Sequence, residues 1–149
     1  MNGFLSRLCS LILVFLMLII APLITSYGVS EVKDEIEILN ISSEFLDKVV
    51  DKRSISQEDM DEFYLQLEAH GKVLDVDVQR LVKVSTLNPE QTEANTTYIA
   101  ADSLDALNIR DIVKIKLKEK SVTPYKKLLN MFLKIDCNPY ELELAKMVR

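Results

Sequence analysis

The sequence predicts an α+β fold in which a long amino-terminal helix packs on a small antiparallel sheet, with two further short helices. Three observations predict it. An uncharged apolar run continues into a segment of helical periodicity, later segments alternate apolar and polar residues as half-buried strands do, and two segments begin with helix-start signals. Because 48% of the 149 residues are apolar, we expect one folded domain beyond the apolar run.

The first element is the apolar run LCSLILVFLMLIIAPLI at residues 8–24, in which Ser10 is the only polar side chain. No charge occurs over residues 8–30, and a helix of that length measures about 35 Å at about 1.5 Å per residue. The hydrocarbon core of a bilayer is roughly 30 Å thick, so this segment can cross a membrane once. Pro22 removes a backbone hydrogen bond, and we expect a bend there.

The charges that flank the run predict its orientation. Arg7 precedes the run. Four acidic residues follow it: Glu31, Asp34, Glu35 and Glu37. The positive-inside rule therefore predicts a single-pass protein of the cell membrane with a cytoplasmic amino terminus and an extracellular carboxyl-terminal domain. We expect residues 1–27 to form the cytoplasmic tail and transmembrane anchor, and residues 28–149 to form the extracytoplasmic domain.

A cleaved signal peptide, which would release a secreted domain, is the alternative to an anchor. The residues after the run, 25–28, offer no clear small-x-small cleavage site. Charge also limits the partners: 18 basic against 23 acidic side chains give a net charge of -5, so we expect no direct contact with nucleic acid. We expect no disulfide between Cys9 in the run and Cys137 in the outer domain.

Beyond the run, apolar residues recur at steps of three and four, which predicts that the helix continues outward as one rod over residues 8–52. The expected apolar stripe comprises Val29, Val32, Ile36, Leu39, Phe45 or Leu46, and Val49 or Val50. Residues 54–56 break the rod, and Ser56 with Asp59 forms a capping box that starts a second helix. Its expected apolar stripe is Met60, Phe63, Tyr64 and Leu67. Gly71 ends this helix, and His70 beside it is expected to cap the helix end.

Three later segments alternate as strands do. The first covers residues 74–84, where Leu81 after Arg80 interrupts the alternation and predicts a bulge. The second places Val113, Ile115 and Leu117 on one face and a row of lysines, Lys114, Lys116 and Lys118, on the other. This lysine row indicates a solvated strand face or a protected sheet edge. The third covers residues 140–148, for which the Glu and Leu content keeps a helix open as the alternative.

Two segments lie between these strands. A polar loop is expected over residues 88–97, and residues 98–107 are ambiguous, with a short helix capped at Asp102 or Ser103 as one interpretation. Thr123 followed by Pro124 predicts the start of a third helix. Its expected buried face is Leu128, Leu129, Phe132 and Leu133.

The sequence supplies few groups for chemistry, so we expect no enzyme, no cofactor and no metal site. His70 is the single histidine, and the chain lacks a nucleophile elbow, a phosphate-binding glycine loop and a CxxC pair. Asp75 and Asp77 lie on one side of a strand at a spacing that suits acid and base roles, but an exposed strand face has the same pattern. Cys137 is expected to be a small buried hydrophobic residue.

A motif spans the end of the long helix, the second helix and the first strand, in the segment FLDKVVDKRSISQEDMDEFYLQLEAHGKVLDVDV. It fits the pattern I-S/T-x-x-D-x-x-x-F-x-x-x-L-x-x-x-G at Ile55, Ser56, Asp59, Phe63, Leu67 and Gly71. With the apolar helix that contains Pro22 and the ending LAKMVR, this arrangement resembles the type IV pilin superfamily, in particular minor pilins and pseudopilins of the tight-adherence type.

The resemblance implies a membrane-anchored structural subunit of a surface pilus, conjugation or secretion apparatus. Such a subunit assembles through its amino-terminal helix, here Leu11, Leu16, Leu18 and Pro22, and its partners are the lipid bilayer and other pilin-like subunits or envelope apparatus proteins. Gly3-Phe4 matches the family's processing site, whereas Leu8 stands where the mature family members have Glu. The alternative is a single-pass envelope accessory protein whose outer domain binds a partner protein without filament assembly.

Overall fold

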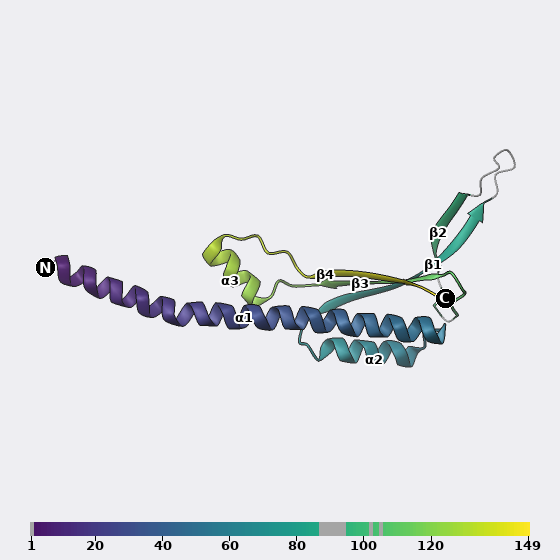
Figure 1. Cartoon of the computed structure of the whole chain (residues 1–149), viewed down its shortest axis with the longest axis horizontal. Coiled ribbons are helices and arrows are strands. Elements are labelled where there is room, and N and C mark those ends of the chain that lie inside the picture. Colours follow the sequence, from purple (N-terminus) through teal and green to yellow (C-terminus); the bar gives the residue numbers. More distant parts are fainter. Residues whose placement is uncertain (1, 87–94, 102, 105) are drawn as a thin grey trace. The chain divides into compact units, whose positions relative to one another are not determined.

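The computed structural model describes residues 2–86, 95–101, 103–104 and 106–149 (Figure 1). Contacts between Cα atoms group the chain into two compact units. We call the first, Met1–Glu35 with Thr123–Cys137, the stalk unit, and the second, Ile36–Val122 with Asn138–Arg149, the sheet unit. The fold is α+β, as the sequence predicts.

The long helix α1 covers Asn2–Lys52, so the predicted continuous helix is confirmed and Pro22 lies inside it. The bend at Pro22 remains a prediction. The helix ends where Arg53 adopts a left-handed backbone with φ of 54°, a conformation that commonly terminates helices. Two contacts hold this turn: the Arg53 carbonyl accepts from the Leu107 N–H at 3.0 Å, and the Arg53 guanidinium donates to the Arg149 carbonyl at 2.8 Å.

The buried stripe of α1 differs in phase from the predicted one. Val29, Val32, Ile36 and Leu39 are exposed, whereas Ile38 and Ser42 are fully buried. Phe45, Leu46, Val49 and Val50 are buried as expected. The Ser42 hydroxyl donates to the Ile38 carbonyl at 2.7 Å, which satisfies a polar group inside the stripe. Because Ser42 is polar but buried, the spacing of apolar residues alone could not identify which face of α1 is buried.

Helix α2, Gln57–Glu68, confirms the second predicted helix and its capping box at Ser56 and Asp59. Phe63 and Leu67 are buried and Met60 packs against the core, whereas Tyr64 is 38% exposed. Gly71 follows the helix with φ of +66°, a conformation that residues with a β-carbon adopt only with strain. Figure 1 shows α2 beside the carboxyl-terminal half of α1.

Within the described residues, four strands form one antiparallel sheet in the order β2-β1-β3-β4. Strand β1 is Leu74–Thr86, β2 is Asn95–Ala101, β3 is Ile112–Glu119 and β4 is Glu141–Met147. The three predicted strands are confirmed, and the helical alternative at the carboxyl terminus is wrong. Strand β2 was missed: residues 98–101 are a strand rather than a short helix, and Ser103 lies outside any helix. Asp102 and residues 88–94 of the expected polar loop lie outside the described residues, and residues 95–97 of that loop belong to β2 instead.

The predicted bulge at Leu81 is wrong. Strand β1 keeps an unbroken register with β3 from Leu74↔Glu119 to Leu81↔Ile112. Alternation continues through Arg80, which takes an inward position and is 7% exposed. Its guanidinium pairs with the buried carboxylate of Asp111, Nη2 to Oδ2 at 2.7 Å. A buried cation, and not an extra residue, interrupts the apolar pattern.

Strand β3 is an inner strand of the sheet, so its lysine row is a solvated face and not a protected edge. Val113, Ile115 and Leu117 are buried on the opposite side. In the register, Lys116 lies between Asp77 of β1 and Glu143 of β4, and Lys118 lies between Asp75 and Glu141. Opposite charges directly across strands stabilise the pairing by small amounts.

The core of the sheet unit lies between the sheet, the carboxyl-terminal half of α1, and α2. The rings of Phe45 from α1 and Phe63 from α2 stack with centroids 4.3 Å apart. The other buried apolar residues are Ile38, Leu46, Val49, Val50, Ile55, Leu67, Leu107, Val113, Ile115, Leu117 and Val148.

Helix α3, Pro124–Leu133, belongs to the stalk unit and confirms the third predicted helix, with Thr123 as its N-cap. Its predicted buried face is partly wrong. Leu129 is half-buried, but Leu128 is 39% and Leu133 is 59% exposed, and the side chain of Phe132 lies outside the described residues. The described residues therefore leave Leu128 and Leu133 of this face exposed.

Candidate functional site: an uncovered apolar helix

The amino-terminal half of α1 is apolar and uncovered. Every residue from 3 to 19 is exposed, and this stretch contains only Ser6, Arg7 and Ser10 as polar or charged side chains. The helix is long and apolar enough to cross a membrane. A helix that is apolar all round is stable where lipid or other apolar helices surround it. This surface is the candidate functional site.

The four residues singled out for assembly lie on α1 as expected. Leu11 and Leu18 are each 69% exposed, and Leu16 is 49% exposed. At 3.6 residues per turn, Leu11, Leu18 and Pro22 share one face of the helix, whereas Leu16 lies on another face. Three of the four residues therefore lie together on one face of the helix, and Leu16 lies apart from them.

The residues of the predicted processing site are accessible. Phe4 is 76% exposed, and a β-carbon placed on Gly3 would meet no described atom within 4 Å. Leu8, which stands where processed pilins have Glu, is 47% exposed and presents an apolar side chain. Cleavage at Gly3-Phe4 stays a prediction.

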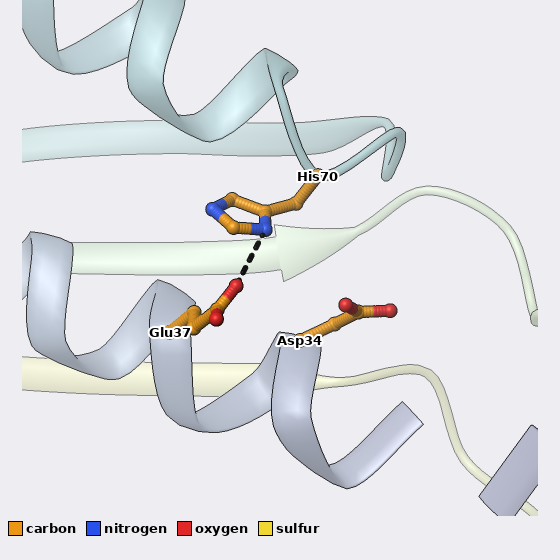
Figure 2. A group of neighbouring side chains, drawn as sticks. All are labelled: Asp34, Glu37 and His70. Atoms are coloured by element: carbon orange, nitrogen blue, oxygen red, sulfur yellow. Dashed lines mark ion pairs between the residues drawn. The ribbon is translucent and has the colours of Figure 1, made fainter. Parts of the chain in front are cut away.

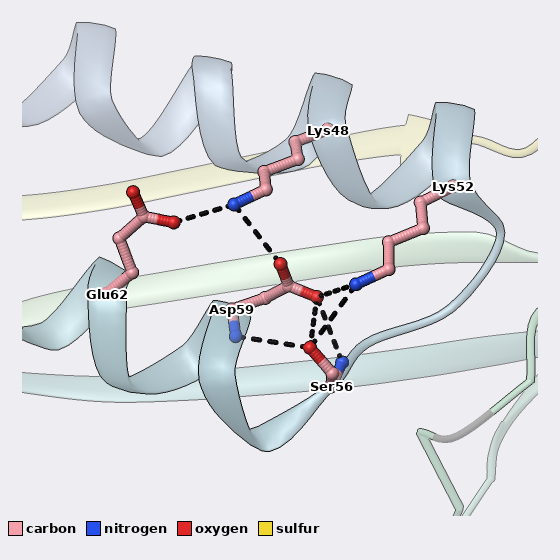
Figure 3. Close-up of polar contacts among 5 residues, drawn as sticks. All are labelled: Lys48, Lys52, Ser56, Asp59 and Glu62. Carbon is pink, nitrogen blue, oxygen red and sulfur yellow. Dashed lines mark hydrogen bonds and ion pairs between the residues drawn. The ribbon is translucent and has the colours of Figure 1, made fainter.

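A charged network joins α1 to α2 in the sheet unit (Figure 3). Lys52 Nζ lies 2.7 Å from Asp59 Oδ2, and Lys48 Nζ lies 3.1 Å from Asp59 Oδ1 and 2.6 Å from Glu62 Oε2. The Ser56 backbone N–H also donates to Asp59, and the Asp59 N–H donates to the Ser56 hydroxyl oxygen. Sequence reasoning found the capping box but missed both lysines, whose spacing of four on α1 was the available signal.

This network holds Asp59 in its ionised form. Its carboxylate is buried, and hydrogen bonds from Lys52 and then from Ser56 lower its pKa far below the usual range of an aspartate. Lys48 stays protonated in the same network, because its hydrogen bonds to Glu62 and Asp59 raise its pKa. The arrangement fixes the α1–α2 turn and offers no group prepared for proton transfer.

His70 makes a contact that the sequence did not indicate. Figure 2 shows its ring pointing toward Glu37 of α1, with Nδ1 3.2 Å from Oε2. The side chains of His70 and Glu37 are 18% and 59% exposed. The capping role expected of His70 is therefore replaced by a pairing with another helix.

The remaining candidates for chemistry lie on the outer surface. Asp75 has a 71% exposed side chain 3.8 Å from Lys120 Nζ, and the Asp77 carboxylate accepts from the Gln79 side chain at 2.7 Å. Cys9 is exposed, and Cys137 is half-buried rather than buried as expected. Both cysteines are free thiols. Solvated acids with these local partners are typical of a strand face.

The described chain has a pilin-like architecture, in which a long amino-terminal apolar helix continues into a segment that packs on a four-stranded antiparallel sheet. Comparisons of the chain with protein-family models, with curated proteins and with solved structures find no match.

Proposed function

We propose that this protein is a membrane-anchored, pilin-like structural subunit of a surface pilus, conjugation or secretion apparatus, and that it assembles through its amino-terminal helix. The observation that supports this most is that every residue from 3 to 19 of α1 is exposed, although this stretch is almost entirely apolar. Full burial of each Leu, Ile, Val, Phe or Met side chain is worth about 1.5–3 kcal/mol. Water is therefore an unfavourable surrounding for this segment, and lipid and neighbouring helices are favourable ones.

In this proposal the first half of α1 spans the membrane and the second half belongs to the folded outer domain. The first half has the length and composition of a membrane span, and the residues of α1 after 35 build the sheet unit through Ile38, Phe45 and Val49. Because one helix carries both segments, it links a membrane-embedded segment to a folded outer domain. The same helix can pack beside copies of itself, and this role requires no catalysis by the chain.

Crosslinking between copies tests assembly. A Cys9→Ser, Cys137→Ser, Leu11→Cys chain in native membranes should form disulfide-linked dimers or adducts with partner subunits after oxidation. Leu18→Gly should reduce crosslinking more than Leu16→Gly, because Leu18 shares the face of Leu11. Pro22→Ala, on that same face, should also reduce it. Leu65→Cys, on the exposed surface of α2, reports contacts outside the helix.

The opposite results would favour the accessory protein. If the Leu11→Cys chain reaches the membrane and forms no adducts, or if all three helix variants crosslink as their parent does, the helix serves as an anchor only. A single-pass envelope protein that binds its partner through the outer domain would then be the better account.

The amino-terminal residue of the membrane-extracted protein tests processing. Residue 1 or 2 is expected for an uncleaved anchor, and residue 4 is expected if Gly3-Phe4 is cleaved as in processed pilins. A start near residue 27 would show that the apolar run is a signal peptide and would contradict the proposed function. Intact mass measured on the same sample identifies the start directly.

A further inference from the structure

We propose that α3 is an interfacial helix that lies in the outer headgroup boundary of the phospholipid bilayer, beside the end of the membrane-spanning segment. This inference rests on the proposed function, because it requires α1 to be inserted. It assigns a second membrane contact to a segment about 100 residues after the anchor.

The first observation is an uncovered apolar surface on and after α3. Leu128 is 39% and Met131 is 77% exposed on one side of the helix. Leu133, which is 59% exposed, lies on another side, and Ile135 after the helix is 49% exposed. In a helix that serves only a water-soluble core, such side chains point inward and are covered. A helix of 10 residues is also marginal by itself in water, so its apolar face needs a surrounding that stabilises it.

The second observation is the position of α3 within the stalk unit. An apolar crevice of about 190 Å³ lies between α3 and the last turns of the uncharged segment of α1. Its lining residues are Ile20, Leu23, Ile24, Tyr27, Tyr125 and Leu128. A β-carbon on Gly28 would lie 2.7 Å from the Tyr125 hydroxyl oxygen, so Gly28 permits this close approach. Helix α3 is therefore level with residues 20–28, the outer end of the span.

The third observation is the charge pattern at this level. Lys126 Nζ lies 3.4 Å from Glu31 Oε1 and 3.1 Å from Glu35 Oε1. Both glutamates lie just beyond the uncharged segment of α1, residues 8–30. The Lys126 side chain is 13% exposed, so this contact pins one side of α3. Lys127 and Lys134 are exposed at the two ends of the helix. Exposed lysines beside an apolar face are typical of helices that lie in the headgroup region.

Lipid is favoured over a neighbouring copy as the cover of this face. The apolar surface of α3 lies in the same unit as the exposed apolar surface of α1, where Leu23 is 48%, Tyr27 is 54% and Val29 is 51% exposed. If the bilayer covers these residues of α1, it also reaches α3 at the same level. Tyrosines are enriched at this depth because their rings are apolar and their hydroxyl groups are polar, and Tyr27 and Tyr125 fit that preference.

Depth-dependent fluorescence quenching of the full chain tests the proposal. In a Cys9→Ser, Cys137→Ser background, single cysteines replace Met131, Asn130 or Leu16, and each carries an environment-sensitive fluorophore. The protein is reconstituted into phosphatidylcholine–phosphatidylglycerol vesicles that contain lipids spin-labelled at a shallow or a deep position. Iodide serves as the aqueous quencher. Asn130 is the matched control, because it is an exposed polar residue of the same helix adjacent to Met131.

We expect the Met131 label to emit at shorter wavelength than the Asn130 label, to be quenched by the shallow spin label, and to be protected from iodide. The Leu16 label should be quenched by the deep spin label. If Leu16 is deep but Met131 is as accessible to iodide as Asn130, the inference is overturned and the anchor stands. If Met131 is protected from iodide and also from the spin-labelled lipids, and it crosslinks to a second copy, a neighbouring subunit covers α3. If Leu16 itself is not quenched by lipid, the anchor and the interfacial helix both fail.

Discussion

Arg80 and Asp111 form a buried ion pair in the sheet unit, in which the Arg80 Nη2 and Nε atoms lie 2.7 Å and 2.8 Å from Asp111 Oδ2. Their side chains are 9% and 4% exposed. Arg80 also donates to the Ser103 carbonyl at 3.3 Å, and Asp111 accepts from the Asn108 N–H at 2.9 Å. The pair thus ties the middle of β1 to the segment that leads into β3.

Replacing Arg80 by Met should destabilise the fold strongly, because it leaves the Asp111 carboxylate buried without its cation. Removal of one partner of a buried pair costs about 3–5 kcal/mol. Urea unfolding of the full chain in detergent micelles measures the change in the free energy of unfolding. Lys83→Met, at an exposed position of the same strand, is the control and should change it by less than about 0.5 kcal/mol. If both substitutions lowered the free energy of unfolding equally, the buried ion pair would not be a main source of stability.

Asp59 should make the stability of the sheet unit depend on pH in the acidic range. Its pKa is lowered in the folded state, so its contribution is fully present above the ordinary aspartate pKa of about 3.9. That contribution is lost as the pH falls through the lowered pKa. The parent chain should therefore lose stability below about pH 4, and Asp59→Asn should show a flatter profile in this range.

At neutral pH, Asp59→Asn should cost roughly 1–2 kcal/mol, since both lysine partners are about half exposed and water screens their charges. Asp61→Asn is the matched control on α2, because Asp61 is exposed and its carboxylate accepts a hydrogen bond from the neighbouring Gln57 side chain. Thermal unfolding at a series of pH values compares the two. A pH profile for Asp59→Asn parallel to that of the parent would contradict the assigned role.

The stacked rings of Phe45 and Phe63 should be a main stabilising contact between α1 and α2. Phe63 is 1% exposed, and Phe63→Ala should lower the free energy of unfolding by about 3–5 kcal/mol. Tyr64→Ala removes a neighbouring aromatic ring that is 38% exposed, and its effect should be clearly smaller. Denaturant midpoints of the two variants decide the matter, and similar losses would indicate that burial at position 63 is not what stabilises the pair.

Gly28→Ala should loosen α3 from α1, because the added methyl group would lie 2.7 Å from the Tyr125 hydroxyl oxygen and 3.1 Å from the ring carbon that bears it. A disulfide between cysteines at Ile24 and Leu128, which line one crevice, should form less efficiently in this variant. Gly3→Ala, where a β-carbon meets no described atom within 4 Å, is the control and should leave crosslinking unchanged. Unchanged crosslinking in Gly28→Ala would mean that α3 does not depend on this close approach.

Local signals predicted most elements of the fold. The capping box at Ser56, the Thr123-Pro124 helix start and the alternation of Val113, Ile115 and Leu117 each act within a few residues, and each was confirmed. Strand β2 was missed because its stability depends on pairing with β1, from Arg80↔Ala101 to Thr86↔Asn95, and not on a strong pattern of its own.

The errors concerning individual side chains have a common physical cause. Arg80 lies inward, paired with Asp111, and its charge led to the wrong prediction of a bulge. Ser42 also lies inward, bonded to the Ile38 carbonyl, and its polarity led to the wrong prediction of the buried stripe of α1. The face of α3 was expected to be buried because an apolar stripe has the same appearance whether protein or lipid covers it. The candidate site itself, the run around Leu11 and Leu18, could be identified from composition alone.

The most direct test of the central claim is the activity of an alkaline phosphatase fused after Arg149, measured separately in carbonate-washed membranes and in the soluble fraction. We predict activity that stays with the membranes, because the positive-inside rule favours an inner amino terminus beside Arg7, and α1 would then carry the sheet unit to the outer side. An inactive fusion, with a cytoplasmic reporter active at the same position, would contradict the orientation. Activity found only in the soluble fraction would contradict the anchor.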